Sequence, residues 1–485
     1  MLASPDAGIC PFPSPSGCYG SRPGIKILHH RTLRNLLAAE LFSLIASWGQ
    51  SSGGSLSIGT GVTQQDRLLE AWNLLVPSTH HDYITGTAIP DVFHTEQMGL
   101  LEQAASLSRG ILEDTLRTVA GAIKPQNVQS PSLFPVAVFN PLGFSRENEV
   151  AYICGDDVKN ASITVSGTSY QKTNDGGLLF AASAPALGYQ TAYLTNADNP
   201  PANPVVVSPP ANPVSATQVN ISNGLVSATL QQNSTGIWGL TSVIDLATGT
   251  QLINQNSFAN QLLFYQENGD EYQFGNELTE PAWNLADVSA YLSNPAIEIV
   301  ESGTFRAIVR TSFTYNDGST QLEYVMEYIM YASEAMLRMR TKGAAPMIQT
   351  GPYTGYSVLT SFLLNPALPI DTVVRGTPYH WTGVMPNWIS PQQVYWNGPM
   401  FMPTHNFVIP QASGAALCAI YHSDVPAWGI SYEWNSANQS FDQNNATLYG
   451  CLWRNGNGNY FSWVANTDYL SHWAPTPRSM SENMR

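Results

Sequence analysis

The chain is poor in charged residues. Asp, Glu, Lys and Arg form 11% of its 485 residues, against about 25% in an average soluble protein. Acidic residues outnumber basic ones by 35 to 20, which leaves a net charge of −15. This balance argues against a nucleic-acid partner, because a nucleic-acid-binding surface needs a basic stripe that displaces counterions.

Long apolar runs and a leader sequence are also missing. The longest apolar candidate, Leu36 to Trp48, is interrupted by Glu40 and is shorter than the roughly 18–20 residues that cross a bilayer. We therefore expect no membrane span. Residues 1–20 have neither the basic nor the apolar region of a signal peptide.

Cysteine is scarce. None of the five cysteines forms a Cys-x-x-Cys pair, which argues against a structural zinc cluster, and the odd number leaves at least one thiol unpaired within the chain. They are Cys10, Cys18, Cys154, Cys418 and Cys451.

Asn-x-Ser/Thr sequons occur in spite of the missing leader. They lie at Asn160, Asn220, Asn233, Asn438 and Asn445. Together with the low Lys content they favour a lumenal or extracellular protein, in a lysosome-like or other secretory compartment. A lumenal protein without an entry signal predicts that its natural N-terminus lies upstream of Met1.

The first quarter of the chain has helical periodicity. Apolar residues recur at helical spacing from Ser21 to Trp48, from about Thr63 to Pro77, and from Pro90 to about Ile123. Short connections between amphipathic helices predict a three-helix bundle over residues 21–124. Residues 1–20, rich in Pro, Gly and Ser, are expected to be irregular.

The periodicity changes from 3.6 to 2 after a Pro/Gln/Ser linker at 124–135. This change predicts a small β domain over residues 133–195 and a large β-sandwich region over 215–485. The clearest hairpin has its turn at Asn316-Asp317-Gly318, and Ala335 to Arg340 is expected to add a strand. The fold class predicted is α+β and mostly β, with several domains.

The segment between the second and third predicted helices carries the most chemistry. It reads Ser-Thr-His-His-Asp-Tyr-Ile-Thr-Gly-Thr from Ser78 to Thr87, and imidazole and carboxylate groups are ligands of zinc. Neighbouring loop residues point in different directions, so we expect His80 and His81 not to bind the same ion. One or two ligands are fewer than the three or four of a catalytic zinc site. The alternative is a polar connection capped by its own Asp and Thr side chains.

The longer string His-His-Asp-x-Ile-Thr-Gly-Thr resembles the middle-domain motif of the zinc-dependent family 38 α-mannosidases. Three other stretches are similar to segments of that family: the start of the helical domain, the first strand after it and the opening of the large sandwich. They are Tyr19 to Pro23, Val138 to Arg146 and Asn223 to Val226. Order and spacing agree over residues 18–260, and beyond that the resemblance is architectural only.

This resemblance implies a fold and a set of roles. The implied fold is a three-helix bundle followed by β-sandwich domains, with a large sandwich of galactose-mutarotase type. His81 corresponds to a zinc ligand, Asp82 to the carboxylate that binds mannose hydroxyls, and His80 to a residue that shapes the loop beside the substrate. The implied activity is zinc-assisted hydrolysis, with retention, of α-mannosidic bonds in glycoprotein glycans.

The resemblance also implies that this chain lacks part of the active site. In that family an N-terminal α/β domain carries the nucleophile, the general acid and three further zinc ligands, and residues 1–20 leave no room for it. We expect one zinc ligand and no catalytic residue here, an inactive isolated chain, and a missing domain or separate chain as partner. Two departures from the family pattern, Thr79 for Gln and Val92 to Glu96 for Val-x-x-Asp-Tyr, remove no ligand.

Other polar and aromatic groups have simpler interpretations. His422-Ser423-Asp424 is a His-x-Asp triplet but reads as a turn at a strand end, and His29-His30-Arg31 as a partly packed helix surface. An aromatic run suits either sugar stacking or sealing of a sandwich edge. It comprises Tyr379, Trp381, Trp388, Tyr395, Trp396 and Phe401. A non-catalytic carbohydrate-binding or partner-binding β-sandwich protein is therefore the alternative function.

Overall fold

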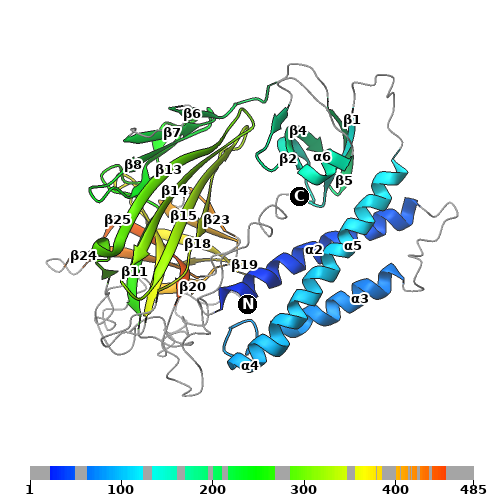
Figure 1. Cartoon of the computed structure of the whole chain (residues 1–485), viewed down its shortest axis with the longest axis horizontal. Helices are drawn as coiled ribbons and strands as arrows, with labels where there is room; N and C mark the ends of the chain where they lie inside the picture. Colours follow the sequence, from blue (N-terminus) through cyan, green and yellow to red (C-terminus); the bar gives the residue numbers. More distant parts are fainter. Residues whose placement is uncertain are drawn as a thin grey trace.

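The computed structural model describes most of the chain. The described residues are 22–49, 63–123, 134–160, 170–194, 200–209, 217–267, 285–346, 355–377, 380–384, 400–404, 406–412, 415–416, 418–422, 427–435 and 440–454. Helices occupy the first part and antiparallel sheets fill nearly all the rest (Figure 1). The fold is α+β and mostly strand, as predicted. No helix among these residues has the length and hydropathy to span a membrane.

Three long helices pack together at the start of the chain (Figure 1). They are α2 (Pro23–Gly49), α3 (Gln64–Leu75) and α5 (Met98–Ala122). Thr63 caps α3 through a capping box with Asp66, which is why the helix begins there. Buried apolar side chains from all three helices form one core: Ile25, Leu36, Ala39, Ala71, Leu75, Leu101, Ala104 and Ile111. The three predicted helices are confirmed over their described residues.

The third predicted helix contains an irregularity that its periodicity did not indicate. It begins as α4 (Pro90–Val92), continues as a π-helical turn, η2 (Phe93–Gln97), and only then becomes α5. The backbone N–H of Met98 donates to the carbonyl of Phe93, five residues earlier. A π turn accommodates one extra residue and is frequently found at functional sites.

A small β unit follows the bundle. Strand β1 (Phe134–Asn140) pairs with β5 (Gly188–Leu194). A second sheet has the order β2-β4-β3, and a short helix, α6, lies between β2 and β3 in the chain. Their bounds are β2 Arg146–Ile153, α6 Gly155–Asn160, β3 Tyr170–Lys172 and β4 Leu178–Ala184. Phe42 of α2 and Phe139 of β1 meet edge to face at 5.4 Å between ring centroids, which joins this unit to the bundle.

The rest of the described chain forms the large sandwich. Its elements are β6 Val206–Ser208, β7 Gln218–Ser222, β8 Val226–Gln232, β9 Trp238–Asp245, β10 Thr250–Gln251, β11 Gln261–Glu267, β12 Leu285–Ala286, η3 Ser289–Tyr291, β13 Leu292–Ser302, β14 Arg306–Asn316, β15 Gln321–Tyr331, β16 Leu337–Lys342, β17 Gly355–Leu363, β18 Thr372–Thr377, β19 His380–Val384, β20 Met400–Pro403, β21 Phe407–Ala412, β22 Ala415–Ala416, β23 Ile420–Tyr421, β24 Ala427–Asn435 and β25 Ser440–Arg454. The sheet orders are β10-β9-β8-β7-β6, β12-β11-β17-β25-β24-β20, β13-β14-β15-β16 and β19-β18-β21-β22, with β23 against β21.

The hairpin predicted from Asn316-Asp317-Gly318 is present. Strands β14 and β15 pair up to Asn316 opposite Gln321, and Gly318 has a φ of +89°, a conformation that favours glycine. The additional strand expected at Ala335 to Arg340 is β16, which begins and ends two residues later than expected, at Leu337 and Lys342. One face of this hairpin lies in the main apolar core, through Val309, Phe313, Tyr324 and other buried residues at every second position.

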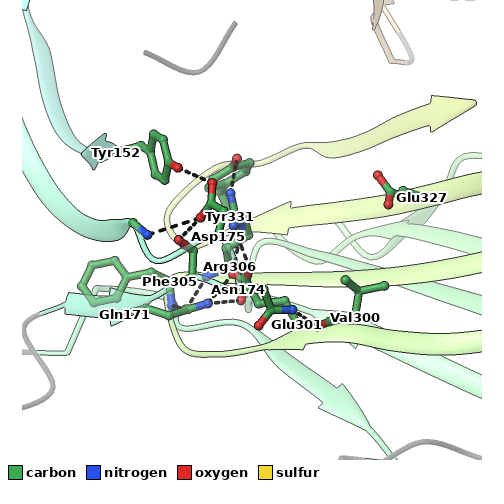
Figure 2. Close-up of polar contacts among 12 residues, drawn as sticks. Tyr152, Gln171, Asn174, Asp175, Val300, Glu301, Phe305, Arg306, Glu327 and Tyr331 are labelled. Atoms are coloured by element: carbon green, nitrogen blue, oxygen red, sulfur yellow. Dashed lines mark hydrogen bonds and ion pairs between the residues drawn. The ribbon is translucent and has the colours of Figure 1, made fainter. Parts of the chain in front are cut away.

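Buried polar contacts join the small β unit to the large sandwich (Figure 2). The side-chain amide of Gln171 donates to Glu301 Oε1 at 2.6 Å, and its carbonyl accepts the backbone N–H groups of Phe305 and Arg306, each at 2.9 Å. Arg306 in turn forms two hydrogen bonds with the Glu301 carboxylate, at 2.7 and 2.9 Å. Both charged side chains are only 6% exposed, so each depends on the other for compensation.

We predict that Arg306→Met destabilises the sandwich by about 3–5 kcal/mol, because it leaves the Glu301 carboxylate buried without its cation. Arg338→Met is the matched control. It removes a pair with Glu334 whose side chains are 42% and 18% exposed, and should cost about 1 kcal/mol or less. Urea denaturation followed by Trp fluorescence measures both, and equal losses would contradict the prediction.

We also predict a loss of stability in alkali that depends on Tyr328. Burial raises the pKa of this tyrosine to about 12, although the hydrogen bond that its hydroxyl accepts from Asn260 opposes the rise. Its stabilising effect is complete below the ordinary pKa of about 10 and declines as the pH rises from 10 toward 12. Between pH 9 and 11, Tyr328→Phe should therefore lose about 1 kcal/mol less stability than the parent chain. Identical pH dependence in urea denaturation would contradict this.

Candidate functional site

The segment from Ser78 to Thr87 folds as a series of tight turns. A 3₁₀ turn, η1 (Val76–Thr79), leads into it from α3. The backbone N–H groups of Tyr83 and Ile84 both donate to the carbonyl of His80, at 2.9 and 3.0 Å, and the N–H of Gly86 donates to the carbonyl of Tyr83 at 3.0 Å. Gly86 has a φ of +79°, which lets the chain turn back toward the bundle. The three residues between Thr79 and Tyr83 are left projecting outward.

These three side chains form a cluster at the surface. His80, His81 and Asp82 are 60%, 78% and 57% exposed, and one donor atom of each lies within 4.8 Å of the others. His81 Nε2 is 3.2 Å from Asp82 Oδ2. Within the part of the chain that the structure describes, this is the one group of at least three His, Cys, Asp or Glu side chains with the spacing of a metal site.

The two histidines do not point apart, contrary to our expectation from the sequence. Their ring centroids are 4.2 Å apart and the rings are inclined by 35°. The turn closed by the carbonyl of His80 curls the backbone here, so two successive side chains share one side of it. Nothing in the residue order alone indicates this curvature.

Hydrogen bonding distinguishes the two imidazoles. The backbone N–H of Asp82 donates to His80 Nδ1 at 3.2 Å, so neutral His80 carries its proton on Nε2. Because Nδ1 of His80 accepts this bond and Nε2 carries the proton, neither nitrogen of His80 can bind a cation unless the loop rearranges. The ring of His81 lies beside Asp82 and His80, and neither of its nitrogens accepts a backbone N–H in the described residues. The geometry therefore favours His81 over His80 as a metal ligand.

Helix α2 holds the start of the loop through a histidine. His29 Nδ1 lies 2.7 Å from the hydroxyl of Ser78, and that hydroxyl donates to the carbonyl of Leu75 at 2.6 Å. Because the hydroxyl has one proton, His29 must be the donor, and its proton is on Nδ1. Ser78 is fully buried. The sequence indicated only a partly packed helix surface at His29 and missed this role.

Arg22, which directly precedes α2, and Lys26 in its first turns hold the end of the loop. Lys26 Nζ donates to the carbonyl of Thr85 at 3.2 Å. Arg22 Nη1 donates to the carbonyl of Ala88 at 2.6 Å, and its guanidinium lies 4.1 Å from the ring centre of Phe93. Both cations are at least nine-tenths buried. They therefore bind the backbone of the loop and are not exposed to a ligand.

The π turn holds the middle of the loop. Gln97 Nε2 donates to the backbone carbonyl of Asp82 at 3.3 Å, and the hydroxyl of Tyr83 donates to the backbone carbonyl of Gln97. Burial, and then the charge of Glu96, raise the pKa of Tyr83 to about 12, against a hydrogen bond from the N–H of Leu101. The Tyr83 hydroxyl thus lies between two backbone groups of the third helix.

Threonine side chains complete the loop from within. The hydroxyl of Thr85 donates to the backbone carbonyl of His81. The hydroxyl oxygens of Thr85 and Thr87 are 2.9 Å apart. Thr87 Oγ1 is 3.4 Å from Asp82 Oδ1. The self-capped polar connection considered from the sequence is therefore present, and it supports the His-Asp cluster instead of replacing it.

The remaining candidates add nothing to this site. His422 donates its backbone N–H to the carbonyl of Asn406, and its ring lies 5.7 Å from that of Trp428; Ser423 and Asp424 lie outside the described residues. Most of the aromatic run also lies outside them. Only the backbones of Trp381 in β19 and Phe401 in β20 are described.

We predict that Ser78→Ala destabilises the bundle by about 1–3 kcal/mol, because it removes two hydrogen bonds of a buried hydroxyl, one with His29 Nδ1 and one with the Leu75 carbonyl. Thr79→Ala is the matched control. Its hydroxyl makes the same kind of bond, to the carbonyl of Val76 at 2.8 Å, but is exposed, so its loss should cost about 0.5 kcal/mol or less. Thermal denaturation followed by far-UV circular dichroism tests this, and equal effects would contradict it.

The helical region of the chain matches a known protein family, and the fold of the whole chain is similar to solved structures. Residues 16–119 match the family model described as the alpha mannosidase middle domain. No curated protein sequence matches the chain. Among solved structures, it is similar to an alpha-mannosidase from Enterococcus faecalis V583, with a TM-score of 0.61 and 14% identity over 97% of this chain and 57% of that one. A glycosyl hydrolase family 38 protein from Enterococcus faecalis gives 0.56 and 13% over 97% and 59%. The chain thus spans less than three-fifths of either structure.

Proposed function

We propose that this chain, which carries an α-mannosidase middle domain on the fold of the family 38 α-mannosidases, supplies one part of a zinc-assisted α-mannosidase site. The proposed substrates are α-mannosides of glycoprotein glycans, cleaved with retention, in the lumen of the secretory pathway or a lysosome-like compartment. The observation that carries the proposal is the His80-His81-Asp82 cluster, held outward on a supported loop.

The donor set fits zinc. Two imidazole nitrogens and a carboxylate oxygen are ligands that Zn²⁺ accepts, and they lie within 4.8 Å of one another. We assign His81 as the ligand, because His80 accepts the N–H of Asp82. Bound zinc supplies a Lewis acid that holds sugar hydroxyls. One ligand does not make a catalytic site, so the remaining ligands would come from a further domain or a separate chain.

Asp82 has the chemistry of a sugar-binding residue. Its carboxylate is exposed beside His81, and its oxygens can accept hydrogen bonds from vicinal hydroxyls. Thr87 on one side and the Gln97 contact to its backbone on the other limit the directions in which it can face. We propose that Asp82 binds the hydroxyls of the mannose to be cleaved. His80 borders the same position and keeps the loop closed.

The proposed site needs carboxylates beyond this loop. A retaining glycosidase uses a nucleophile and an acid whose carboxyl groups are about 5–5.5 Å apart, and residues 78–87 contain one carboxylate, Asp82. We therefore propose that the chain on its own has no hydrolytic activity. The predicted division into a bundle at 21–124, a small β domain at 133–195 and a large sandwich from 215 is part of this proposal.

We predict that the purified chain binds zinc weakly and that His81→Ala weakens this binding at least tenfold. His94→Ala is the matched control, because His94 is an exposed histidine of the neighbouring π turn that is not in the cluster. Competition with a zinc-binding dye measures both variants. Equal affinities in the parent chain and His81→Ala would reject His81 as the ligand.

We further predict no release of 4-nitrophenol from 4-nitrophenyl α-mannoside by the purified chain with added zinc. The reason is that the loop lacks the carboxylate pair that retention requires. Absorbance of the released phenolate provides the measurement. Release that disappears in His81→Ala would show that this chain completes its own site and would overturn the proposed division.

A further inference from the structure

We infer that Gln97 is a positioning residue for the His81-Asp82 pair and that the π-helical turn orients it toward the loop. The inference rests on the proposed function for the identity of the ligand. Gln97 contacts no ligand in this scheme, because it is 95% buried under the loop. It acts through the backbone of the residues that do.

Gln97 binds the loop at two consecutive residues. Its side chain donates to the carbonyl of Asp82 at 3.3 Å, and its own carbonyl accepts the hydroxyl of Tyr83. The peptide that follows Asp82 is thereby fixed against the third helix. The contacts from α2 and from Arg22 just before it lie farther along the chain, at Ser78, Thr85 and Ala88. Among the contacts that reach the loop from outside residues 78–88, that of Gln97 is therefore the nearest along the chain to His81 and Asp82.

The π turn accounts for the direction of Gln97. The N–H of Met98 bonds to the carbonyl of Phe93, so the turn Phe93–Gln97 contains one residue more than an α-helical turn. One residue of an α-helix corresponds to about 100° of rotation. The loop meets the third helix at Pro90. Without the extra residue, the position of Gln97 relative to Pro90 would be rotated by about 100° around the helix axis, and its side chain would point away from the loop. Such turns are concentrated at functional sites.

Stability alone does not explain an amide at this position. Gln97 Oε1 is buried and has no hydrogen-bond partner among the described residues. A buried acceptor without a partner destabilises a fold. An apolar side chain of the same length would fill this space without that penalty. The group that makes glutamine useful here is its N–H, which binds Asp82.

The test compares two glutamines of the same bundle in the full chain. Gln97→Met removes the donor to Asp82 and keeps the side-chain length. Gln64→Met is the matched control: Gln64 Nε2 donates to Thr115 Oγ1 at 2.7 Å, and it lies at the start of α3, whereas the loop follows the end of that helix. Backbone amide exchange of Tyr83, Ile84 and Gly86 reports on the loop, because each N–H is bonded within it.

We expect Gln97→Met to accelerate exchange at these three amides at least tenfold and to weaken zinc binding at least tenfold. Gln64→Met should leave both within twofold of the parent chain. Loop exchange within twofold of the parent in Gln97→Met would overturn the inference. Gln97→Leu, which also lacks the donor, decides the matter if Gln97→Met fails to fold, with the same two outcomes.

The zinc and exchange measurements separate the two proposals. Absence of zinc binding by the parent chain would reject the proposed function. The exchange rates are measured without metal, and they alone decide whether Gln97 positions the loop.

Discussion

Immobilisation of the loop backbone between Ser78 and Ala88 is the constraint on which the candidate site depends. The side chains of His80, His81 and Asp82 are largely exposed and contact mainly one another, so their own packing cannot hold them together. Their positions follow from the backbone beneath, which is bonded internally at His80 and Tyr83. It is also bonded by Arg22, which directly precedes α2, by Lys26 and His29 of α2, and by Gln97 of the third helix.

The same reliance on buried polar contacts joins the other parts of the molecule. Arg306 and Glu301 pair where the small β unit meets the sandwich, and Gln171 binds both (Figure 2). Farther along the same sheet Glu298, Arg310, Glu327 and Arg340 stand opposite one another on successive strands and form ion pairs. A chain with few charges thus uses several of them as ordered pairs, where alternating signs across strands are favourable.

The side chains of the loop suit the proposed role of supplying one part of a site. An imidazole and a carboxylate held side by side suit a metal ion and the hydroxyls of a sugar. They do not include the second carboxylate that glycosidic bond cleavage requires. The likeness to the two Enterococcus faecalis structures covers nearly all of this chain but under three-fifths of each of theirs. The proposed role therefore depends on carboxylates and zinc ligands that residues outside this loop supply.

The sequence by itself determined the local elements and the identity of the candidate site. Helical periodicity located the helices, Asn316-Asp317-Gly318 located the hairpin turn, and the His-His-Asp string indicated the loop. These signals are local, because helix periods and turns depend on residues a few positions apart. Tertiary structure alone decided that His80 and His81 lie together, that a π turn interrupts the third helix, and that His29, Lys26 and Gln97 hold the loop. Those contacts join residues 49, 59 and 15 positions apart, and no pattern within one segment records which distant segment it will meet.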